Sequence, residues 1–84
     1  MLVFVNIFVD SPMMDTVLHN LNSLDEVVGL YEVTGEFDII SIIKCKDIEE
    51  FRHILKDKIL KIPGVKSTVS AVVLHTHKGN INDQ

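Results

Sequence analysis

The alternation of apolar and polar positions along the chain predicts four strands and two helices. Residues 2–9 are almost continuously apolar and rich in β-branched side chains, as in a strand that is buried on both faces. Ser11 is expected to cap the first helix and Pro12 to take its first position, and the helix is expected to end near Ser23. Its single apolar face comprises Met14, Val17, Leu18, Leu21 and Leu24.

The next two apolar segments, residues 27–34 and 38–44, predict the second and third strands. The short segment TGEFD, residues 34–38, joins them and indicates a tight antiparallel connection.

A second helix is predicted between the third and fourth strands. Asp47 can cap it, and Glu50 three positions later can reach back to complete a capping box. The expected buried stripe comprises Ile48, Phe51, Leu55, Ile59 and Ile62. Pro63 and Gly64 are expected to end the helix, and residues 65–75 to form the fourth strand.

The resulting order, β-α-β-β-α-β, predicts an α+β, ferredoxin-like fold: a four-stranded antiparallel sheet with both helices on one face. The first strand is apolar on both faces, with Leu2, Phe4 and Phe8 on one and Val3, Val5, Ile7 and Val9 on the other. A sheet face left open to water should be polar. We therefore expect another copy of the chain to cover the open face, giving a dimer.

Composition supports this expectation. The chain has 84 residues, which is one domain at most, and 46% of them are apolar. A chain of this size buries only about 60–65% of the surface that its unfolded form exposes. An oligomer interface is the simplest place for the excess of apolar side chains.

Charge and cysteine content exclude several classes of protein. The net charge of −4 and the lack of a basic patch argue against direct nucleic-acid binding. No apolar run reaches the ~18 residues of a transmembrane helix, and the N-terminal segment lacks the features of a signal peptide. Cys45 has no second cysteine to pair with, which fits a reducing cytoplasm, and it is expected to be a packing residue.

Two stretches and the order of the elements resemble one known family. GLYEVTGEFDIISII (29–43) carries a glycine–acid–aromatic–acid turn between two strands, and IPGVKSTVSAVVL (62–74) opens the last strand with I-P-G-V. Over residues 1–76 the chain resembles the effector-binding, or RAM, domain of the leucine-responsive/asparagine-regulator (Lrp/AsnC) family. The resemblance implies a dimer made by open sheet faces, assembly into higher rings and small-molecule binding at interfaces.

Members of that family usually carry an N-terminal helix-turn-helix domain, whereas here the first predicted strand begins at residue 2. We therefore expect a stand-alone ligand-sensing domain, residues 1–76, followed by a polar C-terminal tail, residues 77–84. The family's direct operator binding is not implied for such a chain. A full-length regulator of the same family, docking through its own effector domain, is a candidate partner.

The turn around Gly35 is the predicted ligand site. An amino acid needs an acceptor for its ammonium, donors for its carboxylate and a pocket for its side chain. Glu36 and Asp38 supply carboxylates, and Phe37 supplies an apolar wall; a plain hairpin turn, with Gly35 serving only its conformation, is the alternative. The resemblance implies that this turn lines an effector pocket between dimers, and that Thr68 and Ser70 contribute to it from a neighbouring chain.

The other candidate residues are expected to have ordinary structural roles. His75 and His77 would share one side of the last strand and could bind zinc or nickel, but a solvated strand end is the preferred interpretation. Tyr31 is expected to be an interface tyrosine. No catalytic residue, metal site or cofactor is predicted.

Three functions remain open. The first is a homo-oligomeric module that senses an amino acid or similar metabolite and modulates transcription through a related regulator. The second is a small dimeric α+β enzyme, similar to monooxygenases or isomerases, with a pocket between sheet and helices. The third is a purely structural assembly piece in which the turn is only a contact. The apolar helix stripes disfavour the enzyme, whose pocket would need convergent polar groups.

Overall fold

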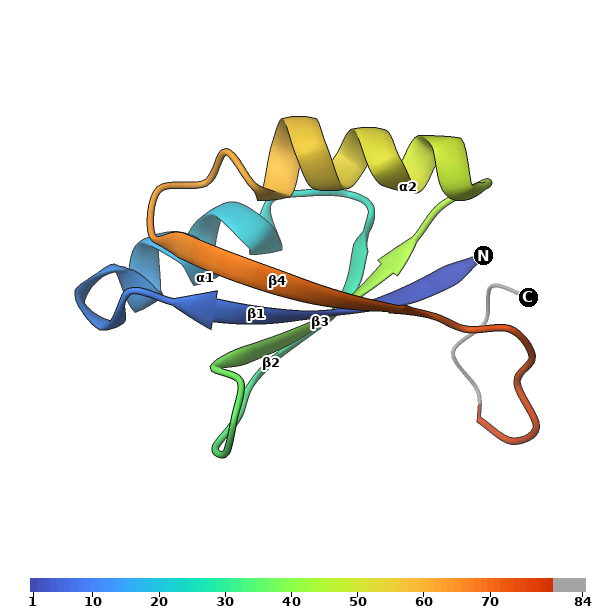
Figure 1. Cartoon of the computed structure of the whole chain (residues 1–84), viewed down its shortest axis with the longest axis horizontal. Helices are drawn as coiled ribbons and strands as arrows, with labels where there is room; N and C mark the ends of the chain where they lie inside the picture. Colours follow the sequence, from blue (N-terminus) through green and yellow to red (C-terminus); the bar gives the residue numbers. More distant parts are fainter. Residues whose placement is uncertain (80–84) are drawn as a thin grey trace.

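Two helices cover one side of a four-stranded antiparallel sheet in the computed structural model, which describes residues 1–79 (Figure 1). The strands are β1 (Leu2–Val9), β2 (Val27–Glu32), β3 (Ile39–Lys44) and β4 (Val65–Val72), in the sheet order β2-β3-β1-β4. The helices are α1 (Met14–Asn22), entered through the 3-10 turn η1 (Ser11–Met13), and α2 (Ile48–Ile54), continued by the π-helical turn η2 (Leu55–Ile59). The predicted ferredoxin-like fold is confirmed.

The core lies between the helices and one face of the two central strands. On β1, Val3 pairs with Ile43 of β3 and Ile7 with Ile39, so these side chains share the helix-facing side. The helices contribute Val17, Leu21, Phe51, Ile54 and Ile59, all buried. Each such side chain stabilises the fold by roughly 1.5–3 kcal/mol relative to leaving it in water.

The second helix does not keep a regular α-helical stripe. Ile48 is 55% exposed, whereas Ile54, absent from the predicted stripe, is 1% exposed. One regular turn after Ile54 the buried position would be Lys58, whose charge is costly to bury. The wider π-turn, closed by the Leu60 N–H donating to the Leu55 carbonyl at 2.8 Å, brings Ile59 to the core instead.

The helix caps follow the prediction in part. Asp47 caps α2, since its Oδ1 accepts the Glu50 N–H at 2.9 Å, but the Glu50 carboxylate reaches back to the Lys46 N–H instead of that of Asp47. The prediction that Ser11 caps the first helix is wrong. Pro12 lies inside η1, which Asp10 precedes without a side-chain cap bond, so the chain turns once before α1 begins.

The strands are shorter than predicted. The second ends at Glu32, not Thr34, the third begins at Ile39, not Asp38, and the fourth ends at Val72, not His75. In the predicted polar tail, residues 77–84, the last five residues (80–84) lie outside the described part of the chain. No helix within residues 1–79 is long and apolar enough to cross a membrane.

Gly64, just before β4, is required by both its conformation and its surroundings. Its φ is +100°, and its carbonyl accepts the Asp10 N–H at 2.8 Å. A Cβ there would lie 2.4 Å from Cβ of Met13 and 2.9 Å from Cγ2 of Val17. Gly64 therefore lets the start of β4 pack directly against the entry of α1.

We predict that Gly64→Ala lowers the free energy of unfolding by about 3 kcal/mol, because strain at positive φ adds to a steric clash. Gly35→Ala is the matched control: φ there is +107°, but nothing lies within 4 Å of the added Cβ. It should cost only about 1–2 kcal/mol. Urea unfolding of both variants tests this, and equal costs would show that the Met13 contact is unimportant.

Candidate functional site

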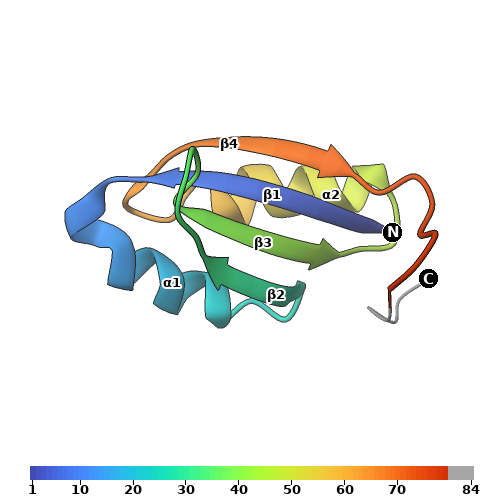
Figure 2. The ribbon, with the colours of Figure 1, turned by 90° about the horizontal axis from the view of Figure 1, so that it is seen from below.

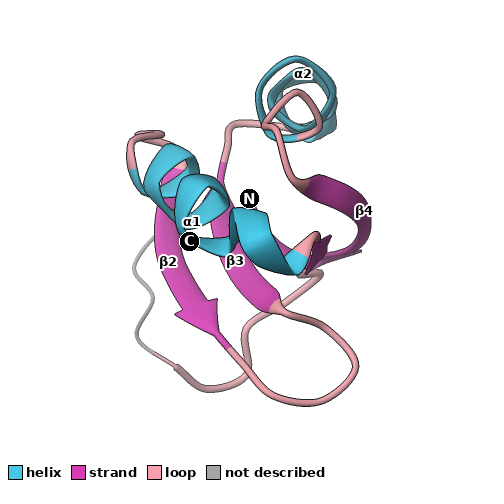
Figure 3. Cartoon of the chain, turned by 90° about the vertical axis from the view of Figure 1, so that its left-hand side faces the viewer, coloured by secondary structure: helices cyan, strands magenta, loops and turns pink. Residues whose placement is uncertain are grey.

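The loop between β2 and β3, residues 33–38, bends to the side of the sheet away from the helices. Figure 1 and Figure 3 show it extending from that side, and Figure 2, which looks at that face, shows it crossing in front of β1. The Val33 N–H donates to the Asp38 carbonyl at 3.0 Å and closes the loop. Gly35 has a φ of +107°, which favours glycine. The loop is therefore a defined element whose tip is exposed.

Asp38 fixes the base of this loop. Its N–H donates to the Ile7 carbonyl at 3.1 Å, and its Oδ2 accepts the Val9 N–H at 2.8 Å. The last backbone pair between β1 and β3 is Ile7 with Ile39. The Asp38 carboxylate thus supplies an acceptor for the Val9 N–H just beyond the last residue pair of β1 and β3. Asp38 therefore has a structural role that its sequence position did not reveal.

Phe37 anchors the loop from the other side. Its ring packs against Phe8 with centroids 5.0 Å apart and planes tilted by 56°, a favourable aromatic geometry. Gly35 and Glu36 remain exposed at the tip. The four predicted loop residues therefore divide into two anchors, Phe37 and Asp38, and two residues that face solvent. Of the two carboxylates, Glu36 is the more exposed.

Thr68 and Ser70 lie on the opposite side of the sheet. They pair with Ile7 and Val5 of β1, so both side chains are on the helix-facing side of the edge strand β4. Thr68 is half-buried and Ser70 is exposed. One chain therefore does not bring these hydroxyls and the loop tip together, and a pocket that uses both would need a second copy.

The face turned away from the helices is apolar, as predicted. Phe4 pairs with Ile42 on β3 and Ala71 on β4. On β2, the Tyr31 ring and Ile42 lie over Gly29, where an added Cβ would be 2.9 Å from Ile42 Cδ1 and 3.2 Å from Tyr31 Cε2. Tyr31 is 55% exposed on this face.

Beyond β4, the segment 73–79 turns back beside the start of β1. The Val73 N–H donates to the Leu2 carbonyl at 2.9 Å. With Leu2 and Phe4 as its floor, the segment encloses a hollow of about 370 Å³. His75 and His77 line it, and their rings meet edge to face at 4.8 Å. Within residues 1–79, no group of three or more His, Cys, Asp or Glu side chains gathers as metal ligands would.

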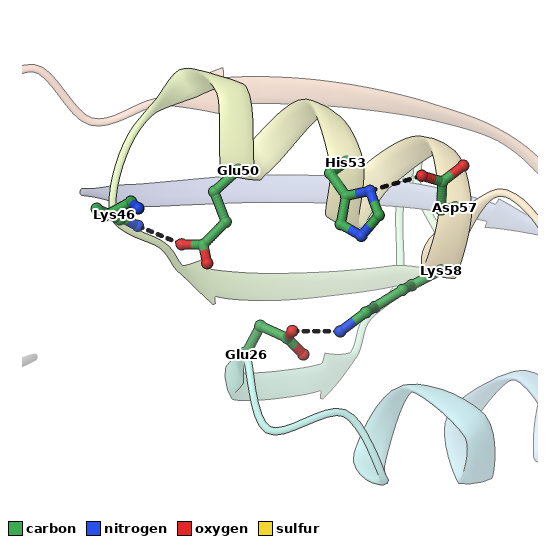
Figure 4. A network of polar contacts seen from close by, with 6 residues as sticks. All are labelled: Glu26, Lys46, Glu50, His53, Asp57 and Lys58. Atoms are coloured by element: carbon green, nitrogen blue, oxygen red, sulfur yellow. Dashed lines mark hydrogen bonds and ion pairs between the residues drawn. The ribbon is translucent and has the colours of Figure 1, made fainter.

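A polar network on the helix side links α2 to the start of β2 (Figure 4). Lys58 Nζ donates to Glu26 Oε2, and this hydrogen bond holds the pKa of Glu26 below its ordinary value. It also raises the pKa of Lys58. His53 Nδ1 lies 2.6 Å from Asp57 Oδ2 on the exposed side of the helix. These contacts lie on the helix side of the molecule, away from the loop between β2 and β3 (Figure 4).

The layer between sheet and helices offers little chemistry. Ser41 is the one buried polar side chain among the described residues, and its hydroxyl donates to the Val5 carbonyl at 3.1 Å. Cys45 is also buried there, as predicted for a packing cysteine, and burial raises the pKa of its thiol. The convergent polar groups that an enzyme pocket needs are not found in the core of residues 1–79.

Comparison with known proteins identifies the family of the chain. The family model of the Lrp/AsnC ligand binding domain matches residues 2–82. The chain belongs to the Lrp/AsnC family. The HTH-type transcriptional regulator FL11 of Pyrococcus horikoshii is 40% identical over 78 residues, which are 93% of this chain and 51% of FL11. The chain thus spans about half the length of this Lrp/AsnC relative.

Solved structures of Lrp/AsnC proteins have the same fold. Escherichia coli AsnC superposes with a TM-score of 0.90 at 30% identity, over 93% of this chain and 53% of AsnC. The transcriptional regulator NMB0573 of Neisseria meningitidis, solved as an L-Met complex, superposes with a TM-score of 0.88 at 22% identity, over 93% of this chain and 52% of that regulator. The family match identifies the chain as a ligand-binding domain of this family.

We predict that the two loop carboxylates differ in their effect on stability. Asp38→Ala leaves the Val9 N–H without its acceptor and should lower the free energy of unfolding by about 1–3 kcal/mol. Glu36→Ala, at the exposed tip, should stay within about 0.5 kcal/mol of the unmodified chain. Chemical denaturation measures both. A stable Asp38→Ala variant would mean that the carboxylate is not part of the sheet's closure.

Proposed function

We propose that this Lrp/AsnC domain is a cytoplasmic sensing and self-association module that binds an amino acid or a similar ammonium-bearing metabolite. The observation that carries the proposal is the anchored loop with Glu36 exposed at its tip. Because Phe37 and Asp38 hold the loop on β1, its tip is presented without a large loss of conformational freedom on binding. Residues 1–76 form the sensing unit in this proposal.

The six predicted residues take different parts in the proposed site. The Glu36 carboxylate accepts the ligand ammonium, and backbone N–H groups around Gly35 donate to the ligand carboxylate. Phe37 walls the side-chain pocket, and Asp38 holds the loop in register. Thr68 and Ser70 enter the site from a neighbouring copy, since they lie on the other side of their own sheet. The ligand would therefore bind between copies.

Self-association through the open face is the second part of the proposal. Val69 of β4 and Tyr31 of β2 are about half exposed on the open face. A second copy of the chain presents the same apolar surface and would remove both from water. The proposed dimer can then assemble into larger rings through the loop contacts.

The proposed output is regulation without direct DNA contact by this chain. Its net charge of −4 disfavours DNA phosphates as partners. A ligand that binds one assembly state more tightly shifts the population toward that state. A full-length regulator of the same family could read that shift by docking its own effector domain. The domain acts in this scheme as a sensor, not as an enzyme.

We predict measurable binding of one or a few of the twenty amino acids, with methionine the first to test because the Neisseria regulator is complexed with L-Met. Isothermal titration gives the affinity. Glu36→Gln should weaken it at least about tenfold through loss of the charged acceptor, whereas Glu49→Gln, exposed on α2, should not change it. Absence of heat with all twenty, together with an unchanged oligomer size, would refute amino acid sensing.

We predict that a charge on the open face prevents dimer formation. Val69→Asp should raise the dimer dissociation constant at least about 100-fold, because it places a charge in a desolvated interface. Ile48→Asp is the matched control on the helix side, with a similar exposure of 55% against 51% for Val69. Sedimentation equilibrium measures both. An unaffected Val69→Asp dimer, or an equal loss in Ile48→Asp, would place the interface elsewhere.

A further inference from the structure

Asn6 is a polar residue at the centre of the apolar open face. It lies on β1 between Phe4 and Phe8, and it pairs with Ile40 of β3 on one side and Val69 of β4 on the other. All four neighbours are therefore apolar. The alternation of β1 places the Asn6 side chain on the same face as theirs.

The amide of Asn6 has no hydrogen-bond partner among the residues that the structure describes. The side chain is half-buried. Water satisfies such a group while the face is open. An apolar partner that covered the face would leave the amide buried and unpaired, which is costly.

Asn6 also lies in the middle of the part of the open face that a partner could reach. Toward one end of β1, the ring of Phe37 lies against Phe8. Toward the other end, the segment 73–79 stands over Leu2 and Phe4. A second copy that is related by a two-fold axis and fits between the Phe37 ring and the segment 73–79 makes its central contact at Asn6.

We infer that the two-fold axis of the dimer passes at Asn6, so that the Asn6 amides of two copies pair with each other. A carboxamide carries both a donor and an acceptor, so two of them related by a two-fold axis can exchange N–H···O bonds. Stacked sheets lie about 10 Å apart, a gap that two facing asparagines and one hydrogen bond of about 2.9 Å fill. The inference rests on the proposed self-association through this face.

The pair would also set the register of the two sheets. Apolar surfaces can slide past one another with little change in buried area, whereas a displaced Asn6 would lose its partner. A buried asparagine that fixes register in this way is well attested in coiled coils. Asn6 thereby determines which residues of the two copies meet, including the loop tip and β4.

The test is a charge swap at this single position. Asn6→Asp and Asn6→Lys should each weaken self-association at least about 100-fold, because like charges would face each other across the axis. An equimolar mixture should regain a dimer containing one copy of each, detected by native mass spectrometry and sedimentation. Asn22→Asp and Asn22→Lys, exposed at the end of α1, are the matched controls and should behave as the unmodified chain alone and mixed.

Each outcome decides the inference. If the unmodified chain dimerises but Asn6→Asp associates equally well, or if the mixture fails to recover, Asn6 does not face its own copy. If the unmodified chain is monomeric at all concentrations, the proposed self-association is refuted. This measurement is made before any variant is tested. Should a charged variant unfold, Asn6→Cys in a Cys45→Ser background replaces it. A short bis-maleimide must then cross-link the dimer at this position, and failure to do so overturns the inference.

Discussion

The structure depends on one constraint: β1 has apolar side chains on both faces, and the helices of residues 1–79 cover only one of them. Val3, Val5 and Ile7 are buried beneath α1 and α2, and this side forms the whole core of the monomer. Phe4 and Phe8 point the other way and keep part of their surface in water. Within residues 1–79, no further layer of helices or strands covers that face of β1. The self-association that we propose rests on this face of the strand and does not depend on a ligand.

The loop that carries the proposed ligand site is held by the same strand. Phe37 packs on Phe8, and the Asp38 carboxylate accepts the Val9 N–H. An acid in an apolar strand indicated a ligand contact, but a backbone N–H at the end of a sheet is an equally good partner for a carboxylate. The two acids of TGEFD therefore have separate tasks in our proposal: Asp38 builds the loop, and Glu36 meets the ligand.

The fold could be predicted from the sequence because the spacing of apolar side chains reveals its elements. Apolar residues recur at every second position in a strand and at every third or fourth position in a helix. The apolar side chains on both sides of β1 and the apolar face of α1 were predictable for this reason. The π-turn at Leu55–Ile59 was not, because it resolves a conflict between burying Ile59 and excluding Lys58 that only three-dimensional packing exposes. Nor could the sequence say that Thr68 and Ser70 face the helices, since a strand's alternation does not reveal which side faces inward. The family resemblance placed these two residues in the same site as the loop tip. Their pairing with β1 instead puts them on the other side of the sheet from the loop of the same chain.

Sensing and assembly share a physical connection in this arrangement. The ring of Phe37 lies between the loop tip, where we place the ligand, and Phe8, which belongs to the face that a second copy would cover. A ligand that draws Glu36 inward would move Phe37 and thus change the surface offered to the partner. Coupling of this kind requires only that the ligand bind the two assembly states with different affinity, and it acts equally in both directions. A change of partner on the open face would therefore alter ligand affinity, even though the partner need not touch the ligand.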